Sequence, residues 1–327
     1  MREAQIKAFL TKAGWADADR QTLASDASAR RYERLSIGNL RAVLMDAPPP
    51  DEDVTAFVEV TEFLRDLGLS APQIHASDAS NGFLLLEDLG DDLFAQVCNA
   101  TPGEETRLYK NAVDLLGELH KAPPPINLPP YDAAVYHREA NLVCDWYLDN
   151  PSPAVYSAFT TALDAALAKL SDAPKAVVLR DYHAENLIDL PDRQGNARVG
   201  LLDYQDALIG HPAYDLVSLL EDARRDTSTA LQEAMIEHYL DLSGADPQSF
   251  RRDYAILGAQ RNLKIIGIFA RLCVRDGKDR YLDMIPRVAA HLARDVSHPA
   301  LGEMKTWIND HLPAPRDAVL AAIRRRR

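Results

Sequence analysis

Residues 176–216 read AVVLRDYHAENLIDLPDRQGNARVGLLDYQDALIGHPAYDL, and this stretch carries the most informative pattern in the chain. It contains two short apolar runs, AVVL and RVGLL, which have the length and the flanking turn residues of buried strands. Asp181 follows the first run after one residue, and Asp203 follows the second run directly. Asn186 stands five residues after Asp181, which gives the spacing D-x-x-x-x-N. The sequence therefore predicts polar side chains at the ends of two short strands.

These three side chains suit phosphoryl transfer. A carboxylate at Asp181 can accept a hydrogen bond from an attacking hydroxyl and orient it, while the Asn186 amide oxygen and the Asp203 carboxylate are hard oxygen ligands of the kind that Mg²⁺ prefers. The protein-kinase template has the same D-x-x-x-x-N spacing and a later metal-binding aspartate. By match to that template, we predict Asp181 as the catalytic base and Asn186 and Asp203 as the Mg²⁺ ligands.

The composition narrows the classes of function. The chain has 327 residues, 47% of them hydrophobic, which is enough for about two domains or one large split fold. A formal net charge of −13 disfavours nucleic-acid binding, because a protein that binds phosphates needs a basic face.

No run of about 18 apolar residues and no signal-peptide pattern is present, so a cytoplasmic protein without a membrane partner is expected. A monomer is the default expectation. Three widely spaced cysteines are expected to be buried thiols: Cys98, Cys144 and Cys273.

The pattern along the chain predicts an α+β fold. Alternation around a Gly-Asn turn predicts a hairpin over 31–45, helical periodicity predicts a helix over 54–67, and residues 82–86 have the character of a buried strand. After these elements, the periodicity is mostly helical. The prediction is therefore a small segment with an antiparallel sheet at residues 1–87 and a larger, mainly helical segment at residues 88–327, with ligands favouring the cleft between them.

Longer segments resemble a known family. LRDYHAENLI and GLLDYQDALIGHPAYDLVSLL are similar to the aminoglycoside-phosphotransferase-like kinases, a family that also includes choline and other small-molecule kinases. The resemblance covers most of the chain and implies a bilobal, protein-kinase-like fold with ATP as co-substrate and Mg²⁺ as cofactor. It also implies structural roles for Asp215, which would brace the catalytic loop, and for His120, which ends a matching L-G-x-L-H helix.

The chain departs from the family pattern at several positions. The usual H-G-D-x-x-x-x-N would place histidine at Leu179 and glycine at Arg180. The family's phosphate-holding strand lysine falls on Met45, and Glu59 matches the glutamate that pairs with that lysine. If an arginine replaces the lysine, three are available nearby: Arg30, Arg31 and Arg41.

The resemblance implies further nucleotide contacts in the first third of the chain. A serine-containing loop before residue 31 takes the place of a glycine-rich phosphate loop, and the segment FLLLEDL resembles the hinge between lobes, where backbone groups would pair with adenine. The predicted nucleotide-binding residues are Ser28, Arg30, Arg31, Glu59, Glu87 and Leu89.

A narrower resemblance suggests the acceptor. The segments SARRYERL, VLMDAPP and YDLVSLLEDARRD look like those of the cell-wall-recycling kinases that phosphorylate N-acetylmuramate and N-acetylglucosamine at the C1 hydroxyl. An arginine can grip the carboxylate of N-acetylmuramate with two parallel hydrogen bonds, and Arg224 is one further candidate for this contact. The predicted substrate-binding residues are Arg180, Gln205, Asp206, Arg225 and Arg261.

Two alternatives stay open on the sequence alone. The first is a kinase for an aminoglycoside or another small hydroxyl compound, for which the Glu221–Asp222 pair could supply an acidic pocket, although Arg224 and Arg225 stand beside it. The second is a pseudokinase-like binding protein, which is supported by the absence of the strand lysine at Met45.

Overall fold

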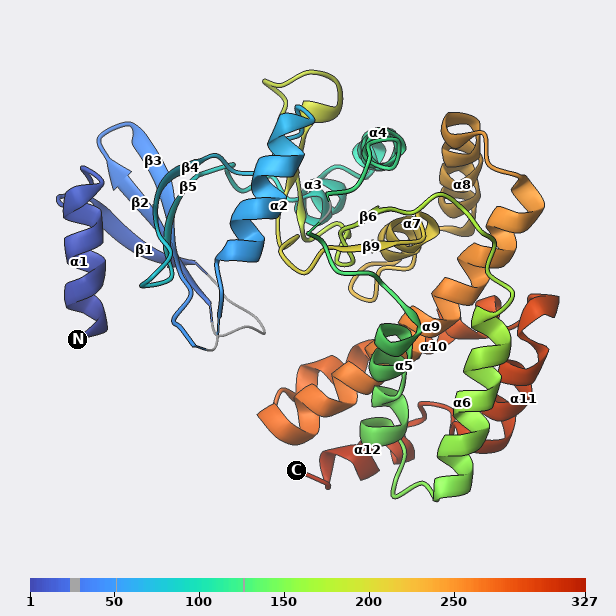
Figure 1. Cartoon of the computed structure of the whole chain (residues 1–327). Coiled ribbons are helices and arrows are strands. Elements are labelled where there is room, and N and C mark those ends of the chain that lie inside the picture. Colours follow the sequence, from blue (N-terminus) through green and yellow to red (C-terminus); the bar gives the residue numbers. More distant parts are fainter. Residues whose placement is uncertain (24–29, 51, 126) are drawn as a thin grey trace. The chain divides into compact units, whose positions relative to one another are not determined.

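The chain was analysed as a computed structural model that describes residues 1–23, 30–50, 52–125 and 127–327 (Figure 1). Contacts divide it into two compact units. The N-terminal unit comprises Met1–Leu115 and Glu185–Ala207, and the C-terminal unit comprises Leu116–Ala184 and Leu208–Arg327. The units therefore do not divide at residue 87, where the sequence analysis placed the lobe boundary.

The sheet of the N-terminal unit has five antiparallel strands in the order β1-β2-β3-β5-β4. The predicted hairpin is confirmed, because β2 and β3 pair from Arg31 with Asp46 to Ile37 with Leu40. The apolar face of α1 covers this sheet, with Phe9 stacked on Phe83 at 5.5 Å between ring centroids. The elements are α1 (Arg2–Lys12), β1 (Asp19–Leu23), β2 (Arg31–Ile37), β3 (Leu40–Asp46), α2 (Thr55–Asp66), β4 (Ile74–Asp78) and β5 (Phe83–Glu87).

A second group of elements completes the N-terminal unit, which includes the segment Glu185–Ala207. The β7–β8 hairpin is bridged to Ser70 through Gly200 and to Leu93 through Ile188, so residues from three parts of the chain pack together. The carboxylate of Asp189 joins this hairpin to α4, since it accepts hydrogen bonds from Arg107 and Arg198. These elements are α3 (Phe94–Ala100), α4 (Glu105–Leu119), β7 (Leu187–Asp189) and β8 (Val199–Leu201).

The C-terminal unit is mainly helical around the 30-residue helix α9, which packs against α5, α7, α10 and α12. A short antiparallel ribbon of β6 and β9 leads into the predicted catalytic loop. Among the residues that the structure describes, no helix is long and apolar enough to cross a membrane. The elements are α5 (Ala133–Ala140), α6 (Pro153–Leu167), β6 (Ala176–Val178), β9 (Leu208–Gly210), α7 (Ala213–Leu220), α8 (Thr229–Ser243), α9 (Pro247–Asp276), α10 (Ile285–Asp295), α11 (Gly302–His311) and α12 (Asp317–Arg324).

These elements confirm the predicted α+β class with a small antiparallel sheet. The predicted helix over 54–67 corresponds to α2, which buries Phe57, Val60 and Leu64. The three cysteines are free and buried, as predicted.

A pair of buried carboxyl groups lies in the core of the C-terminal unit. The Asn262 amide donates to Glu221 at 2.7 Å and to Asp295 at 2.9 Å. All three residues are buried. Burial raises the pKa of Glu221 and of Asp295 above their ordinary values, and the negative charge of Glu221 raises the pKa of Asp295 further. The pair therefore destabilises the folded state when both groups are ionised.

The substitution Asp295→Asn should raise stability at alkaline pH. A carboxyl with a raised pKa in the folded state stabilises the fold below its ordinary pKa, and this contribution is lost as the pH rises through the raised pKa. The variant should therefore gain about 1–2 kcal/mol over the wild type at pH 8 and less at pH 5. Thermal unfolding at both pH values tests this, with the exposed Asp283→Asn as control. An equal or smaller gain at pH 8 than at pH 5 would contradict the analysis.

Candidate active site

The loop that carries Asp181 is held by Asp215. Strand β6 ends at Val178, and the next two N–H groups, of Leu179 and Arg180, donate to the Asp215 carboxylate at 2.7 and 2.8 Å. Arg180 has a φ of 70°, which is strained for a residue other than glycine. A glycine at this position would adopt the same backbone without strain, which explains the glycine of the usual family pattern. Asp215 is fully buried at the start of α7, so it stabilises the turn from a rigid element.

His120 reaches the same carboxylate from the other side. Its Nε2 lies 3.9 Å from Asp215 Oδ2, and its Nδ1 lies 2.8 Å from the hydroxyl of Tyr239. The structure therefore brings the two predicted structural residues, Asp215 and His120, together beneath the Asp181 loop.

Positive side chains surround Asp181, which is half-buried. Burial by itself would raise its pKa, but the positive charges of Lys264, Arg261 and Arg180 hold the pKa of Asp181 below its ordinary value. Burial lowers the pKa of the neighbouring His183 to about 4, so this imidazole is neutral at pH 7. Asp181 is thus an anion at neutral pH and can accept a hydrogen bond from a hydroxyl.

The predicted substrate-binding arginines all lie in the C-terminal unit. Arg261 is buried on α9 and donates to Ser218 Oγ at 2.8 Å, and Arg225 is half-buried. Arg224 Nη1 lies 3.3 Å from His183 Nε2, so Arg224 is held beside the loop that carries Asp181. Arg180 pairs with Glu139.

Two residues of this region escaped the sequence analysis. Glu139 on α5 pairs with Arg180 and also with Lys264 on α9, whose Nζ lies 3.1 Å from Glu139 Oε2. The sequence offered no signal for this cluster, because the burial of Glu139 is visible only in the structure and no spacing rule relates positions 139, 180 and 264.

The predicted metal ligands lie together in the N-terminal unit. The Asn186 carbonyl accepts a hydrogen bond from Leu202 N–H at 3.0 Å, which places the backbone of Asn186 next to the residue before Asp203. Asp203 is exposed, has a φ of 55°, and accepts from Gln205 Nε2 at 2.9 Å. Asp206, the other substrate candidate in this unit, is also exposed.

One carboxylate and one amide oxygen fit a magnesium site that a nucleotide completes. Mg²⁺ is usually held by one or two protein oxygens, with the remaining positions taken by phosphate oxygens and water. Within the described ranges, no group of three or more histidine, cysteine or acidic side chains could hold a metal by itself. Asn186 and Asp203 therefore fit the kind of site in which substrate phosphates supply the other ligands.

Arg30 is the best placed of the three arginines that could replace the strand lysine. Its Nε lies 2.8 Å from Glu52 Oε2, and both side chains are almost buried. Burial by itself would lower the pKa of Arg30, but Tyr32, Glu52 and, to a smaller extent, Asp206 raise it. Arg31 and Arg41, by contrast, are exposed. Met45 is 1% exposed and belongs to the core, where a lysine would lose its hydration.

The structure does not bring Glu59 to this arginine. Glu59 is exposed on α2, because that helix turns Phe57, Val60 and Leu64 toward the core. The acidic partner of Arg30 is Glu52, which precedes the helix.

The remaining nucleotide candidates lie on and near β5. The backbone N–H of Glu87 donates to Gln73 at 2.8 Å, and the Glu87 side chain pairs with Arg193. A contact from Glu87 to a nucleotide would therefore come from its carbonyl. Leu89 is 9% exposed. Ser28 lies outside the described residues.

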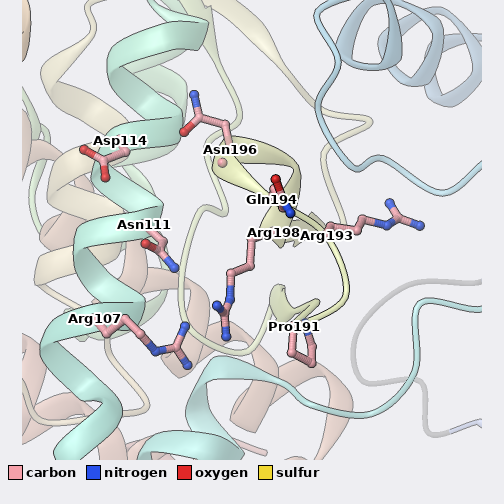
Figure 2. A pocket seen from close by; sticks show the side chains of 9 residues that line it. Arg107, Asn111, Asp114, Pro191, Arg193, Gln194, Asn196 and Arg198 are labelled. Carbon is pink, nitrogen blue, oxygen red and sulfur yellow. The ribbon is translucent and has the colours of Figure 1, made fainter.

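A polar pocket of about 400 Å³ also lies in the N-terminal unit (Figure 2). Arg107 and Asn111 reach into it from α4, and Arg198 faces them from the opposite wall. Arg107 and Arg198 share the carboxylate of Asp189, and Arg193 pairs with Glu87. The three arginines that line the pocket are therefore paired with carboxylates. None of the predicted site residues lines the pocket.

Comparisons with known proteins identify the family of the chain. The model of the phosphotransferase enzyme family matches residues 19–252. The chain is 39% identical to the N-acetylmuramate/N-acetylglucosamine kinase of Caulobacter vibrioides, covering 95% of this chain and 97% of that protein. It is 38% identical to the kinase of the same name from Pseudomonas aeruginosa, with 89% of each chain covered.

The predicted protein-kinase-like fold is confirmed by a solved structure. The choline kinase LicA from Streptococcus pneumoniae matches with a TM-score of 0.64 at 17% identity, over 89% of this chain and 99% of that one. The predicted kinase class is confirmed as well, and the chain belongs to the phosphotransferase enzyme family.

Proposed function

We propose that this enzyme transfers the γ-phosphoryl group of ATP to the anomeric C1 hydroxyl of N-acetylmuramate, N-acetylglucosamine or both, in cytoplasmic peptidoglycan recycling. The observation that carries the proposal is the braced loop after β6, which holds an ionised Asp181 among buried cations. The choice of sugar is supported by relatives named for those two substrates that are similar over almost the whole chain.

In this mechanism, Asp181 orients the acceptor. Its carboxylate accepts the hydrogen bond of the C1 hydroxyl, whose oxygen then forms a bond to the γ-phosphorus while the bond from that phosphorus to the β-bridging oxygen breaks. The hydroxyl proton passes to Asp181. An anomeric hydroxyl is more acidic than an ordinary alcohol, so a carboxylate with a lowered pKa suffices as a base that acts late in the transfer.

The N-terminal unit supplies the nucleotide contacts. Asn186 and Asp203 would hold Mg²⁺, which neutralises phosphate charge when it is bound. Arg30 takes the place of the strand lysine as a cation for the phosphates, and the segment from Glu87 to Leu89 offers backbone groups to adenine. Gln205, beside Asp203, would contact sugar hydroxyls or ordered water.

The arginines around Asp181 favour an anionic sugar over a cationic antibiotic. Arg224 and Arg261 are charged groups near the loop that could meet the carboxylate of N-acetylmuramate. An aminoglycoside would instead need exposed anions, and Glu221 is buried against Asn262 with a raised pKa. If the protein only bound its ligand, it would not need a base together with two oxygen ligands for Mg²⁺.

The substrate prediction is tested by ADP release with Mg·ATP against N-acetylmuramate, N-acetylglucosamine and an aminoglycoside. We expect turnover with at least one of the two sugars, and a ³¹P NMR signal of an anomeric phosphate in the product. A product phosphorylated at another hydroxyl, or turnover of the aminoglycoside alone, would contradict the proposal.

The substitution Asp181→Asn should lower kcat by about 10²–10⁴-fold, because the amide can neither accept the proton nor carry the charge. Nucleotide affinity should stay within about twofold, since Asp181 contacts the acceptor in this mechanism. Steady-state kinetics and calorimetric ADP binding measure the two effects. Asp172→Asn, an exposed carboxylate ahead of the same strand, is the control. Wild-type turnover in Asp181→Asn would refute the assignment of the base.

The substitution Asp203→Ala should act on the nucleotide. We expect Mg²⁺ to lose its effect on ADP affinity in this variant, because one of the two proposed oxygen ligands is gone. Titrations of ADP with and without Mg²⁺ measure this difference, with the exposed Asp192→Ala on the β7–β8 loop as the matched control. An undiminished effect of Mg²⁺ would place the metal on other residues.

A further inference from the structure

Arg34 on β2 joins two carboxylates of the segment 88–91, which follows β5 in the N-terminal unit. Its Nε lies 2.7 Å from Asp88 Oδ2, and its Nη2 lies 3.1 Å from Asp88 Oδ1. Nη1 and Nη2 also donate to the two carboxylate oxygens of Asp91, at 2.9 and 2.8 Å. Because β3 lies between β2 and β5 in the sheet, the arginine side chain reaches across one strand to make these contacts. One guanidinium therefore holds both ends of the segment 88–91.

The ion pair with Asp88 is the one that is removed from water. The side chain of Arg34 is 14% exposed and that of Asp88 is 5% exposed, whereas that of Asp91 is 69% exposed. Loss of one partner from a buried ion pair leaves the other charge uncompensated, which is strongly destabilising. An ion pair with an exposed carboxylate contributes much less. The conformation of the segment 88–91 therefore depends mainly on the pair of Arg34 with Asp88.

The same aspartate shapes the backbone of the segment. Asp88 Oδ1 accepts a hydrogen bond from the N–H of Gly90 at 3.0 Å. Gly90 has a φ of 88°, a conformation that favours glycine. Arg34 Nη2 also lies 3.5 Å from the carbonyl oxygen of Gly90. Arg34 thus holds the carboxylate that holds the turn.

Leu89 lies within this turn and is 9% exposed. Within the part of the chain that the structure describes, its N–H donates a hydrogen bond to no other group. Backbone N–H groups of buried residues almost always have an acceptor. The N–H of Leu89 is therefore a donor that an acceptor atom of a ligand can satisfy.

We propose that Arg34 is a positioning residue for the nucleotide: through Asp88 it fixes the segment 88–91 so that the N–H of Leu89 donates to a ring nitrogen of adenine. This inference rests on the proposed function, which assigns the backbone of this segment to the adenine. Arg34 itself does not contact the nucleotide. Without its charge, the carboxylate of Asp88 turns toward water and releases the N–H of Gly90, so the donor at Leu89 loses its fixed position.

The test compares Arg34→Met with Arg20→Met. Methionine keeps part of the apolar stem of arginine but lacks its charge. Arg20 is the matched control, because it lies on the same sheet and also forms ion pairs with two carboxylates, those of Glu3 and Glu33. We expect Arg34→Met to bind ADP about tenfold more weakly than the wild type, and the control to stay within about twofold. The KM for ATP should rise by a similar factor with little change in kcat, because only binding is affected.

Hydrogen–deuterium exchange, read by mass spectrometry, reports on the segment itself. The N–H of Gly90 is bonded to Asp88, and that of Leu93 is bonded to the Asp91 carbonyl at 2.7 Å. Without nucleotide, peptides that contain residues 88–93 should exchange about tenfold faster in Arg34→Met than in the wild type, because the segment opens locally. Peptides from α4 should exchange at the wild-type rate. Loss of the whole fold would instead speed exchange in both regions.

Two milder variants keep the test decisive if Arg34→Met does not fold. Arg34→Lys keeps the charge but cannot donate pairs of parallel hydrogen bonds, so its ADP affinity should lie between those of the wild type and Arg34→Met. Asp91→Asn removes only the exposed partner and should weaken ADP binding less than Arg34→Lys does.

The inference is overturned if Arg34→Met binds ADP as tightly as Arg20→Met, or if residues 88–93 exchange at the wild-type rate in Arg34→Met. Where the methionine variant does not fold, wild-type ADP affinity in Arg34→Lys overturns it. Failure of the proposed function has a different signature, which is the absence of ADP binding or of sugar turnover in the wild type. The ADP titrations need no acceptor, so they are independent of the choice of sugar.

Discussion

The carboxylate of Asp215 accepts hydrogen bonds from two successive N–H groups, those of Leu179 and Arg180, and the conformation of the loop that carries Asp181 depends on this interaction. The turn that it stabilises has a backbone that only glycine adopts without strain, and here an arginine occupies it. Strain of this kind costs about 1–3 kcal/mol and persists only where the surroundings compensate it. Because Asp215 is buried and lies at the start of a helix, it supplies that compensation from a rigid element.

An arginine in place of the glycine also has a chemical consequence. Its guanidinium brings a positive charge into a buried region that already holds Lys264, and Glu139 offsets one of these two charges. The departure from the family pattern at Arg180 is therefore part of a charge balance that extends over three elements. The positive charges of this region also help to hold the pKa of Asp181 below its ordinary value, against the effect of burial.

The predicted site residues belong to both compact units of the chain. Asp181, the proposed base, belongs to the C-terminal unit, whereas Asn186 and Asp203 belong to the segment 185–207, which is part of the N-terminal unit. This segment groups with residues far earlier in the sequence, because the β7–β8 hairpin is bridged to residues such as Ser70 that lie more than a hundred positions earlier. Local patterns carry no information about such pairings.

The sequence by itself determined the α+β class, the β2–β3 hairpin, the kinase family and the spacing of Asp181, Asn186 and Asp203, because these depend on local periodicity and on motifs of fixed length. Only the tertiary structure decided which basic side chain forms an ion pair with which acidic side chain. It paired Arg30 with Glu52 while Glu59 faces solvent, and it paired Glu139 with Lys264 and with Arg180, the residue before Asp181. Ion pairs between distant elements depend on helix faces and packing, which no spacing along one chain specifies.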